Sequence, residues 1–182
     1  MHYLIFSAAL AVGVADITPT VVLVKKPDAL AQLLPGATRF FTRERNLAGE
    51  EAHRLHEALD WGPEGDKLTF YLGRRAETLV GAALFVRVDT PHGPIEVAVG
   101  FDEAGAVRDV LVTRATVETR RWVEEALRAD LATAYRRLEA GGTPAGAEAV
   151  KGRVGRMAAY MARQVDRGVA RAIVAYGEFY RN

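Results

Sequence analysis

Residues 95–113 read IEVAVGFDEAGAVRDVLVT, and this stretch decides the fold class. Ile95–Phe101 and Val107–Thr113 are rich in β-branched residues, which is typical of strands. The turn signal Asp102–Gly105 separates them, and a connection this short joins antiparallel strands. The stretch therefore predicts a β-hairpin.

Two more strand-like runs precede this hairpin. Leu68–Leu72 and Leu79–Val88 lie on either side of the turn signal Gly73–Arg75. The turn Thr90–Pro94 then leads into the hairpin, and its His92 is expected to be solvated. Four short strands with hairpin-length connections predict an antiparallel sheet rather than βαβ units.

The residues before the sheet predict an extended stretch and two helices. Ile17–Lys26 is rich in β-branched residues and indicates a short strand or an extended lead-in. Ala29–Leu34 is expected to form a short helix that Pro35-Gly36 ends. Ala48–Leu59 has apolar residues at helical spacing, which predicts a second helix.

The residues after the sheet predict two longer helices. Arg120–Leu138 has apolar residues at helical spacing, and so does the last segment, roughly Val150–Tyr176. Four arginines occupy the other side of the last helix: Arg156, Arg163, Arg167 and Arg171. The expected fold class is α+β, an antiparallel sheet of about four to six strands flanked by helices, with a long C-terminal amphipathic helix.

Length and composition indicate one folded domain. The chain has 182 residues, of which 49% are hydrophobic and 26% charged, which suits a buried core and excludes a disordered chain. The absence of cysteine excludes disulfides, thiolate metal sites and cysteine nucleophiles. We expect residues 16–182 to form a single domain.

The charges are distributed unevenly along the chain. Residues 1–113 contain 11 Lys/Arg and 15 Asp/Glu, a net charge of −4, whereas residues 114–182 contain 13 and 8, a net charge of +5. A cationic C-terminal part suits an anionic partner such as a phosphate, a nucleic acid or a lipid headgroup. A solvated helix face is the alternative interpretation.

The first fifteen residues resemble a signal peptide. An apolar run, LIFSAALAVGVA, is too short to span a bilayer and ends in small residues that fit a cleavage site. The start has His2 and no Lys or Arg, so an apolar first helix or strand of the domain is the alternative. We expect residues 1–15 to be a signal peptide and the protein to be periplasmic or otherwise extracytoplasmic.

Common catalytic signatures do not occur in the sequence. It has no G-x-S-x-G, Walker A, G-x-G-x-x-G or H-E-x-x-H pattern, and its only serine is Ser7. His53 and His56 lie three residues apart on a predicted helix without a third ligand at suitable spacing, so we expect no metal site. No residue stands out as an acid, base or nucleophile. This favours an electron carrier or binding protein over a turnover enzyme and leaves enzymatic activity open.

The start of the last predicted helix is a candidate anion site. Residues 151–156 read KGRVGR, with the three cations Lys151, Arg153 and Arg156. Unpaired N–H groups at a helix N-terminus favour anions, and glycines let a phosphate approach closely. The alternative is a cationic helix start with nothing bound, because cations at this end oppose the helix dipole.

Taken in order, several segments resemble the FMN-binding domain family. The family includes the flavin-carrying extracytoplasmic subunits of the Rnf and sodium-translocating NADH:quinone reductase complexes. The resemblance covers about residues 30–176. In the family's order, the segments that carry it are Leu33–Phe40 (LLPGATRF, the "FPGA" segment), Leu79–Gly81 with Ile95–Gly105 (the glycine-containing strand and hairpin), Val110–Thr119 (the strand leading to Glu-Thr) and Arg163–Ala172 (the closing helix).

The chain departs from the family at the covalent attachment point. In covalent members, a threonine at the start of the closing helix carries FMN through a phosphoester bond. That position is Ala159 here, and no Ser or Thr follows Thr143. The glycine after the family's Glu-Thr segment is also replaced, by Arg120-Arg121. The resemblance therefore implies that any flavin is bound non-covalently.

The resemblance implies an extracytoplasmic electron-transfer domain that binds FMN. The phosphate would rest at the start of the closing helix, near Lys151, Arg153 or Arg156, with Ala159 and Arg163 following on that helix. The isoalloxazine would be bordered by three residues: Glu118, Thr119 and Trp122. The expected partner is a redox protein or a membrane electron-transfer complex, and no nucleic acid.

An alternative keeps the fold without the flavin. In this interpretation, the chain is a degenerate FMN-binding-like domain that acts as a binding or assembly module for a redox or membrane partner. The arginine side of the last helix would then face an acidic partner or lipid headgroups. A third interpretation, a general small-ligand pocket under a curved sheet, is also open.

Overall fold

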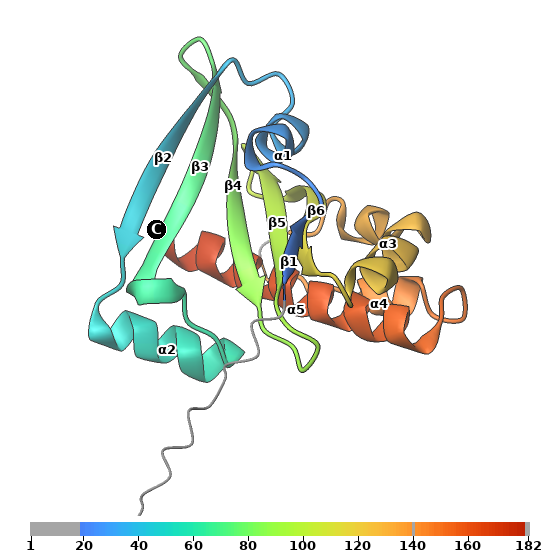
Figure 1. The fold of residues 1–182 in the computed structure, drawn as a ribbon. Helices are drawn as coiled ribbons and strands as arrows, with labels where there is room; N and C mark the ends of the chain where they lie inside the picture. Colours follow the sequence, from blue (N-terminus) through green and yellow to red (C-terminus); the bar gives the residue numbers. More distant parts are fainter. Residues whose placement is uncertain (1–18, 140, 181–182) are drawn as a thin grey trace, which may run out of the picture.

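A six-stranded antiparallel sheet forms the centre of the computed structural model, which describes residues 19–139 and 141–180 (Figure 1). The order across the sheet is β1-β6-β5-β4-β3-β2, so β2 to β6 form a meander and β1 joins its far edge. The strands are β1 (Thr20–Val22), β2 (Arg39–Asn46), β3 (Lys67–Arg75), β4 (Thr78–Val88), β5 (Ile95–Asp102) and β6 (Val107–Thr116). The predicted α+β class is confirmed. The predicted signal peptide, residues 1–15, lies outside the described residues.

Strand β2 was not predicted from the sequence. It pairs antiparallel with β3 along its whole length, from Arg39 opposite Arg74 to Asn46 opposite Lys67. All eight of its residues are exposed, so neither face of the strand requires apolar side chains. Without a buried face, a strand lacks the alternation that identifies it in a sequence.

Two of the predicted helices differ from those of the structure. The helices are α1 (Lys26–Leu33), α2 (Gly49–Leu59), α3 (Arg120–Arg128), α4 (Gly146–Ala149) and α5 (Arg156–Phe179), with short 3₁₀ turns η1 (Glu64–Asp66) and η2 (Leu131–Tyr135). The single helix predicted over Arg120–Leu138 is wrong, because the left-handed residue Asp130, with φ 65°, separates α3 from η2.

The last helix begins at Arg156 rather than at Val150. Gly152 adopts φ 74°, a left-handed conformation that a helix cannot contain, and Gly155 is extended. Lys151 and Arg153 therefore lie in the turn before α5 and not within a helix.

Helix α5 crosses one face of the sheet and closes the main core. Its buried residues include Met161, Val165 and Val169, which belong to the same apolar cluster as Val97 and Val99 of β5. The approach is closest at Gly168, where a Cβ atom would lie 2.8 Å from Val97 Cγ2. Among the described helices, none is long and apolar enough to cross a membrane.

Helix α1 lies on the opposite face of the sheet (Figure 1). The helix and the next residue, Leu34, form an apolar cluster in which Leu30, Leu33 and Leu34 pack with Ala83 of β4 and Ala98 of β5. These small residues alternate with the large side chains that face α5, so the sheet has a thick core on one side and a thin one on the other. Helix α1 covers only part of its face.

Candidate functional site

Three aromatic rings meet where the turn between β4 and β5 reaches α3 and α5. The His92 ring lies 5.3 Å from the Trp122 ring and 5.9 Å from the Tyr160 ring, measured between centroids, and both contacts are edge-on. We call His92, Trp122 and Tyr160 the ring cluster. His92 was expected to be simply solvated, but its side chain is only 34% exposed because the other two rings cover it.

A network of threonines positions the ring cluster. The Thr116 N–H donates to Thr119 Oγ1 (3.0 Å), the Thr119 N–H donates to Thr116 Oγ1 (3.1 Å), and the two hydroxyls lie 2.9 Å apart. The Thr116 hydroxyl also donates to the His92 carbonyl (3.1 Å), and the Trp122 N–H donates to the Thr119 carbonyl (3.1 Å). Thr119 is fully buried. Its hydrogen bonds to Thr116 hold the corner between β6 and α3 together.

Glu118 borders the cluster through a contact with His92. Its Oε1 lies 3.1 Å from His92 Nδ1, and both side chains are partly exposed. The carboxylate thus orients the imidazole at the rim of the cluster. Of the three residues predicted to border a flavin, Glu118 and Trp122 are accessible, while the Thr119 hydroxyl is engaged within the fold.

Exposed arginines surround the rings. The Arg121 guanidinium lies 5.1 Å from the Trp122 ring, and the Arg163 guanidinium lies 5.7 Å from the Tyr160 ring. Within residues 19–139 and 141–180, no carboxylate lies within 4.0 Å of Arg121, Arg156 or Arg163. Planar guanidinium groups without a protein counter-ion suit a phosphate or a carboxylate ligand.

A side chain of the protein, Glu125, lies at the predicted anion site, just before the start of α5. The Gly155 N–H donates to Glu125 Oε1 of α3 at 2.6 Å. Lys151 pairs with Glu148 (3.0 Å), and Arg153 Nη2 donates to the Ala149 carbonyl (2.7 Å). Of the three predicted cations, Arg156 alone has no ion pair or side-chain hydrogen bond within the described part of the chain.

Ala159 lies in the first turn of α5, next to Tyr160 of the ring cluster. It is half-buried, and its N–H donates to the Gly155 carbonyl (2.9 Å). The whole of α5 lacks Ser and Thr, so the helix offers no hydroxyl to carry a phosphoester. The structure thus brings Glu118, Trp122, Ala159 and Arg163 to one place and leaves Lys151 and Arg153 in other contacts.

Sequence reasoning did not identify His92 and Tyr160. His92 belongs to a turn, and Tyr160 lies beside the apolar stripe of α5, so neither carried a pattern of its own. Among the described residues, no three His, Cys, Asp or Glu side chains are placed to hold a metal ion. Comparison with protein-family models finds no matching family, and comparison with curated proteins finds no matching sequence.

Proposed function

We propose that this domain binds FMN non-covalently at the ring cluster and serves as an extracytoplasmic electron-transfer module. The observation that supports it is the ring cluster, with the Arg163 guanidinium beside the Tyr160 ring and Arg156 one turn before Tyr160 on α5. Aromatic edges suit contact with an isoalloxazine, and two guanidinium groups suit a phosphate. The phosphate contacts are assigned to these side chains because the Gly155 N–H, just before α5, already donates to Glu125.

The exposure of the cluster favours electron transfer over substrate turnover. A flavin bound against Trp122 and Tyr160 would keep an edge open to a partner, because both rings lie at the surface of the domain. The proposed partner is a redox protein or a membrane electron-transfer complex. The extracytoplasmic location rests on residues 1–15 alone.

Arg163→Glu is expected to weaken FMN binding by about tenfold to a hundredfold, because a charge-assisted hydrogen bond contributes about 1.5–3 kcal/mol. Binding is measured by calorimetry with added FMN, and acid precipitation is expected to release all of the flavin. Arg54→Glu is the matched control, since Arg54 is exposed on α2 and has no ion pair among the described residues. A protein that takes up no FMN, or equal losses in the two variants, would contradict the proposal.

Fluorescence of the two tryptophans of the chain tests whether FMN binds at the ring cluster. Trp122 belongs to the ring cluster, whereas Trp61 follows α2. In Trp61→Phe, FMN is expected to quench the remaining Trp122 emission strongly, and in Trp122→Phe it is expected to quench Trp61 weakly. Stronger quenching of Trp61 would place the flavin elsewhere and count against the ring cluster.

The second candidate is a module without flavin that docks on an anionic partner through α5. Arg156, Arg163 and Arg167 are exposed and have no carboxylate within 4.0 Å in the described part of the chain. Arg171 differs, since it is half-buried and donates to the Asp60 carbonyl (3.1 Å). Burial and the neighbouring Arg167 lower the pKa of Arg171. The docking surface in this candidate therefore consists of Arg156, Arg163 and Arg167.

For this candidate, the double variant Arg163→Glu/Arg167→Glu is expected to weaken binding to phosphatidylglycerol vesicles about tenfold or more, at about 1 kcal/mol per basic residue near an anionic surface. Co-sedimentation measures the bound fraction. The double variant Arg39→Glu/Arg54→Glu, with the same charge change away from α5, should bind like the unaltered protein. Equal binding to phosphatidylcholine vesicles, or an equal loss in the control, would rule out this surface.

A further inference from the structure

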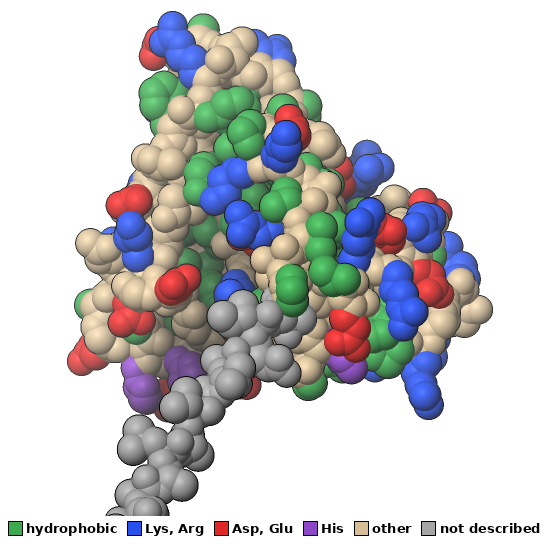
Figure 2. All heavy atoms as spheres, in the orientation of Figure 1, with side chains coloured by type: hydrophobic (Ala, Val, Ile, Leu, Met, Phe, Trp, Pro, Cys, Tyr) green, Lys and Arg blue, Asp and Glu red, His purple; other side chains and the backbone are tan. Residues whose placement is uncertain are grey.

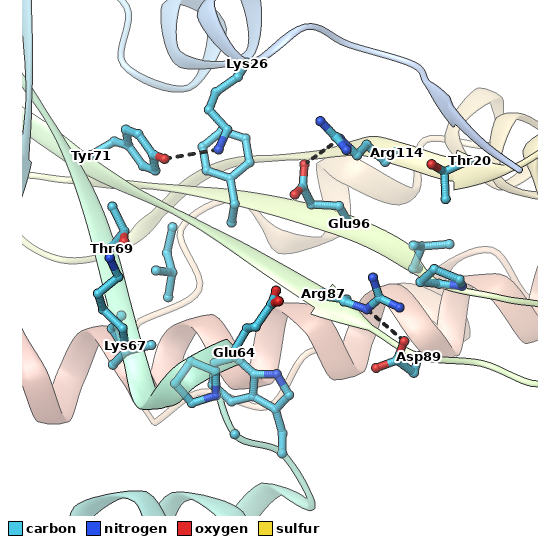
Figure 3. A pocket seen from close by; sticks show the side chains of 18 residues that line it. Thr20, Lys26, Glu64, Lys67, Thr69, Tyr71, Arg87, Asp89, Glu96 and Arg114 are labelled. Atoms are coloured by element: carbon cyan, nitrogen blue, oxygen red, sulfur yellow. Dashed lines mark hydrogen bonds and ion pairs between the residues drawn. The ribbon is translucent and has the colours of Figure 1, made fainter. Parts of the chain in front are cut away.

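A cleft lies on the face of the sheet that α1 covers only in part. Its volume is about 940 Å³, at the upper end of the range for small-molecule sites. Strands β3, β4 and β5 form its floor, α1 lies at one side, and the segment after α2 lies at the other (Figure 3). Lysine and arginine side chains gather on this face between green apolar ones (Figure 2). The cleft shares no residue with the ring cluster.

One side of the cleft presents a cation among aromatic rings. Lys26 Nζ donates to the Tyr71 hydroxyl (3.1 Å) and lies 4.8 Å from the centre of the Phe85 ring. Tyr71 and Phe85 themselves meet edge to face at 5.2 Å. Among the described residues, Lys26 has no carboxylate within 4.0 Å. The ammonium group is thus held in place by neutral groups and retains donors for an anionic ligand.

The other side presents an anion beside a tryptophan. Glu64 and Lys26 point into the cleft from opposite sides (Figure 3). Within residues 19–139 and 141–180, no Lys, Arg or His lies within 4.0 Å of the Glu64 carboxylate. Trp61 lines the same side and is half-buried. The Arg171 guanidinium already lies 5.8 Å from the centre of the Trp61 ring, so the Glu64 carboxylate is the group on this side that suits a ligand's ammonium.

The other charged residues that line the cleft already have partners. Arg87 pairs with Asp89 at 2.9 Å, and Arg114 lies 3.8 Å from Glu96. Lys67 pairs with Glu44 of β2 at 3.1 Å. Each of these pairs has no net charge, so Lys26 and Glu64 are the lining charges that remain for a ligand.

We propose that this cleft binds a zwitterionic small molecule that lies across the sheet face. Its carboxylate or phosphate contacts Lys26 and the Tyr71 hydroxyl, and its ammonium group contacts Glu64 beside Trp61. The apolar middle of the ligand rests on Phe85. This site is separate from the ring cluster, so the proposal does not depend on FMN binding.

The probe for this site is 6-aminohexanoate, compared with hexanoate and hexylamine, which each keep one of its two charges. The readout is the pair of tryptophan indole N–H signals in the nitrogen-15 spectrum of the full chain, assigned with Trp61→Phe. We expect 6-aminohexanoate to shift the Trp61 signal saturably and to leave the Trp122 signal unchanged. Each single-charge probe should bind about tenfold or more weakly, because it loses one charge-assisted contact.

Four variants test the two charged ends. Lys26→Met and Glu64→Gln are each expected to weaken 6-aminohexanoate binding about tenfold to a hundredfold. The controls are Lys25→Met and Glu50→Gln, two exposed residues of the same charge that do not line the cleft. The absence of a saturable shift, equal binding of hexanoate, or unaltered binding by Lys26→Met would overturn the proposal.

Discussion

Asp166→Ala is expected to lower the free energy of unfolding by about 3–5 kcal/mol, because it leaves three hydrogen-bond donors without an acceptor. Asp166 Oδ1 accepts from the Tyr135 hydroxyl and the Gly146 N–H, both at 2.8 Å, and Oδ2 accepts from the Ala147 N–H at 3.0 Å. One carboxylate thus joins α5 to both η2 and α4. Tyr135 is fully buried and Asp166 is partly buried, so we expect the substitution to leave the phenol hydroxyl without a protein acceptor.

Urea unfolding followed by circular dichroism measures this effect. Tyr135→Phe removes one donor and leaves Asp166 with two, so it is expected to cost about 1–2 kcal/mol. Burial, followed by the charge of Asp166, raises the pKa of Tyr135, so the phenol remains a donor. Glu178→Ala, at an exposed position of α5, should change stability by less than about 0.5 kcal/mol. An Asp166→Ala protein as stable as Glu178→Ala would refute the assigned role.

Gly168→Leu is expected to cost about 3 kcal/mol, the upper end of the usual range for overpacking a core. A Cβ atom at Gly168 would lie 2.8 Å from Val97 Cγ2 and 3.1 Å from Val88 Cγ2. Both valines are buried in adjacent central strands, and β-branched side chains have little freedom to rotate away. The helix must therefore lift from the sheet.

Gly177→Leu is the matched control on the same helix. A Cβ atom at Gly177 meets nothing within 4 Å, so the better helix propensity of leucine is expected to stabilise the protein by about 0.5–1 kcal/mol. The two substitutions should shift the urea midpoint in opposite directions. If both variants were destabilised equally, the close approach at Gly168 would not be the cause.

The sequence predicts the parts of the fold that have a buried face. Strands β3 to β6 were identified because apolar residues and turn signals recur along them, and their burial follows those runs. Strand β2 has no buried face and gave no such signal. The break at Asp130 was also missed, because aspartate adopts the left-handed conformation less often than glycine and is therefore a weaker signal for the end of a helix.

The site was predictable only in part. Trp122 and Arg163 were identified through the family resemblance, and the structure brings them together beside the turn between β4 and β5. His92 joins them through contacts across the fold, which a linear pattern does not contain. Glu125 reaches Gly155 across 30 residues of sequence, so the helix start looked vacant when read alone.

Glu125 competes with any free anion for the Gly155 N–H at the start of α5. A carboxylate attached to the same domain has an effective concentration of about millimolar or higher, so a free phosphate competes at a disadvantage. A ligand that displaced Glu125 would also remove this hydrogen bond between α3 and the residue before α5. Because Trp122 lies one turn before Glu125 on α3, such a ligand would disturb the ring cluster. A ligand that displaced Glu125 at the helix start would therefore weaken the binding of a ligand at the ring cluster.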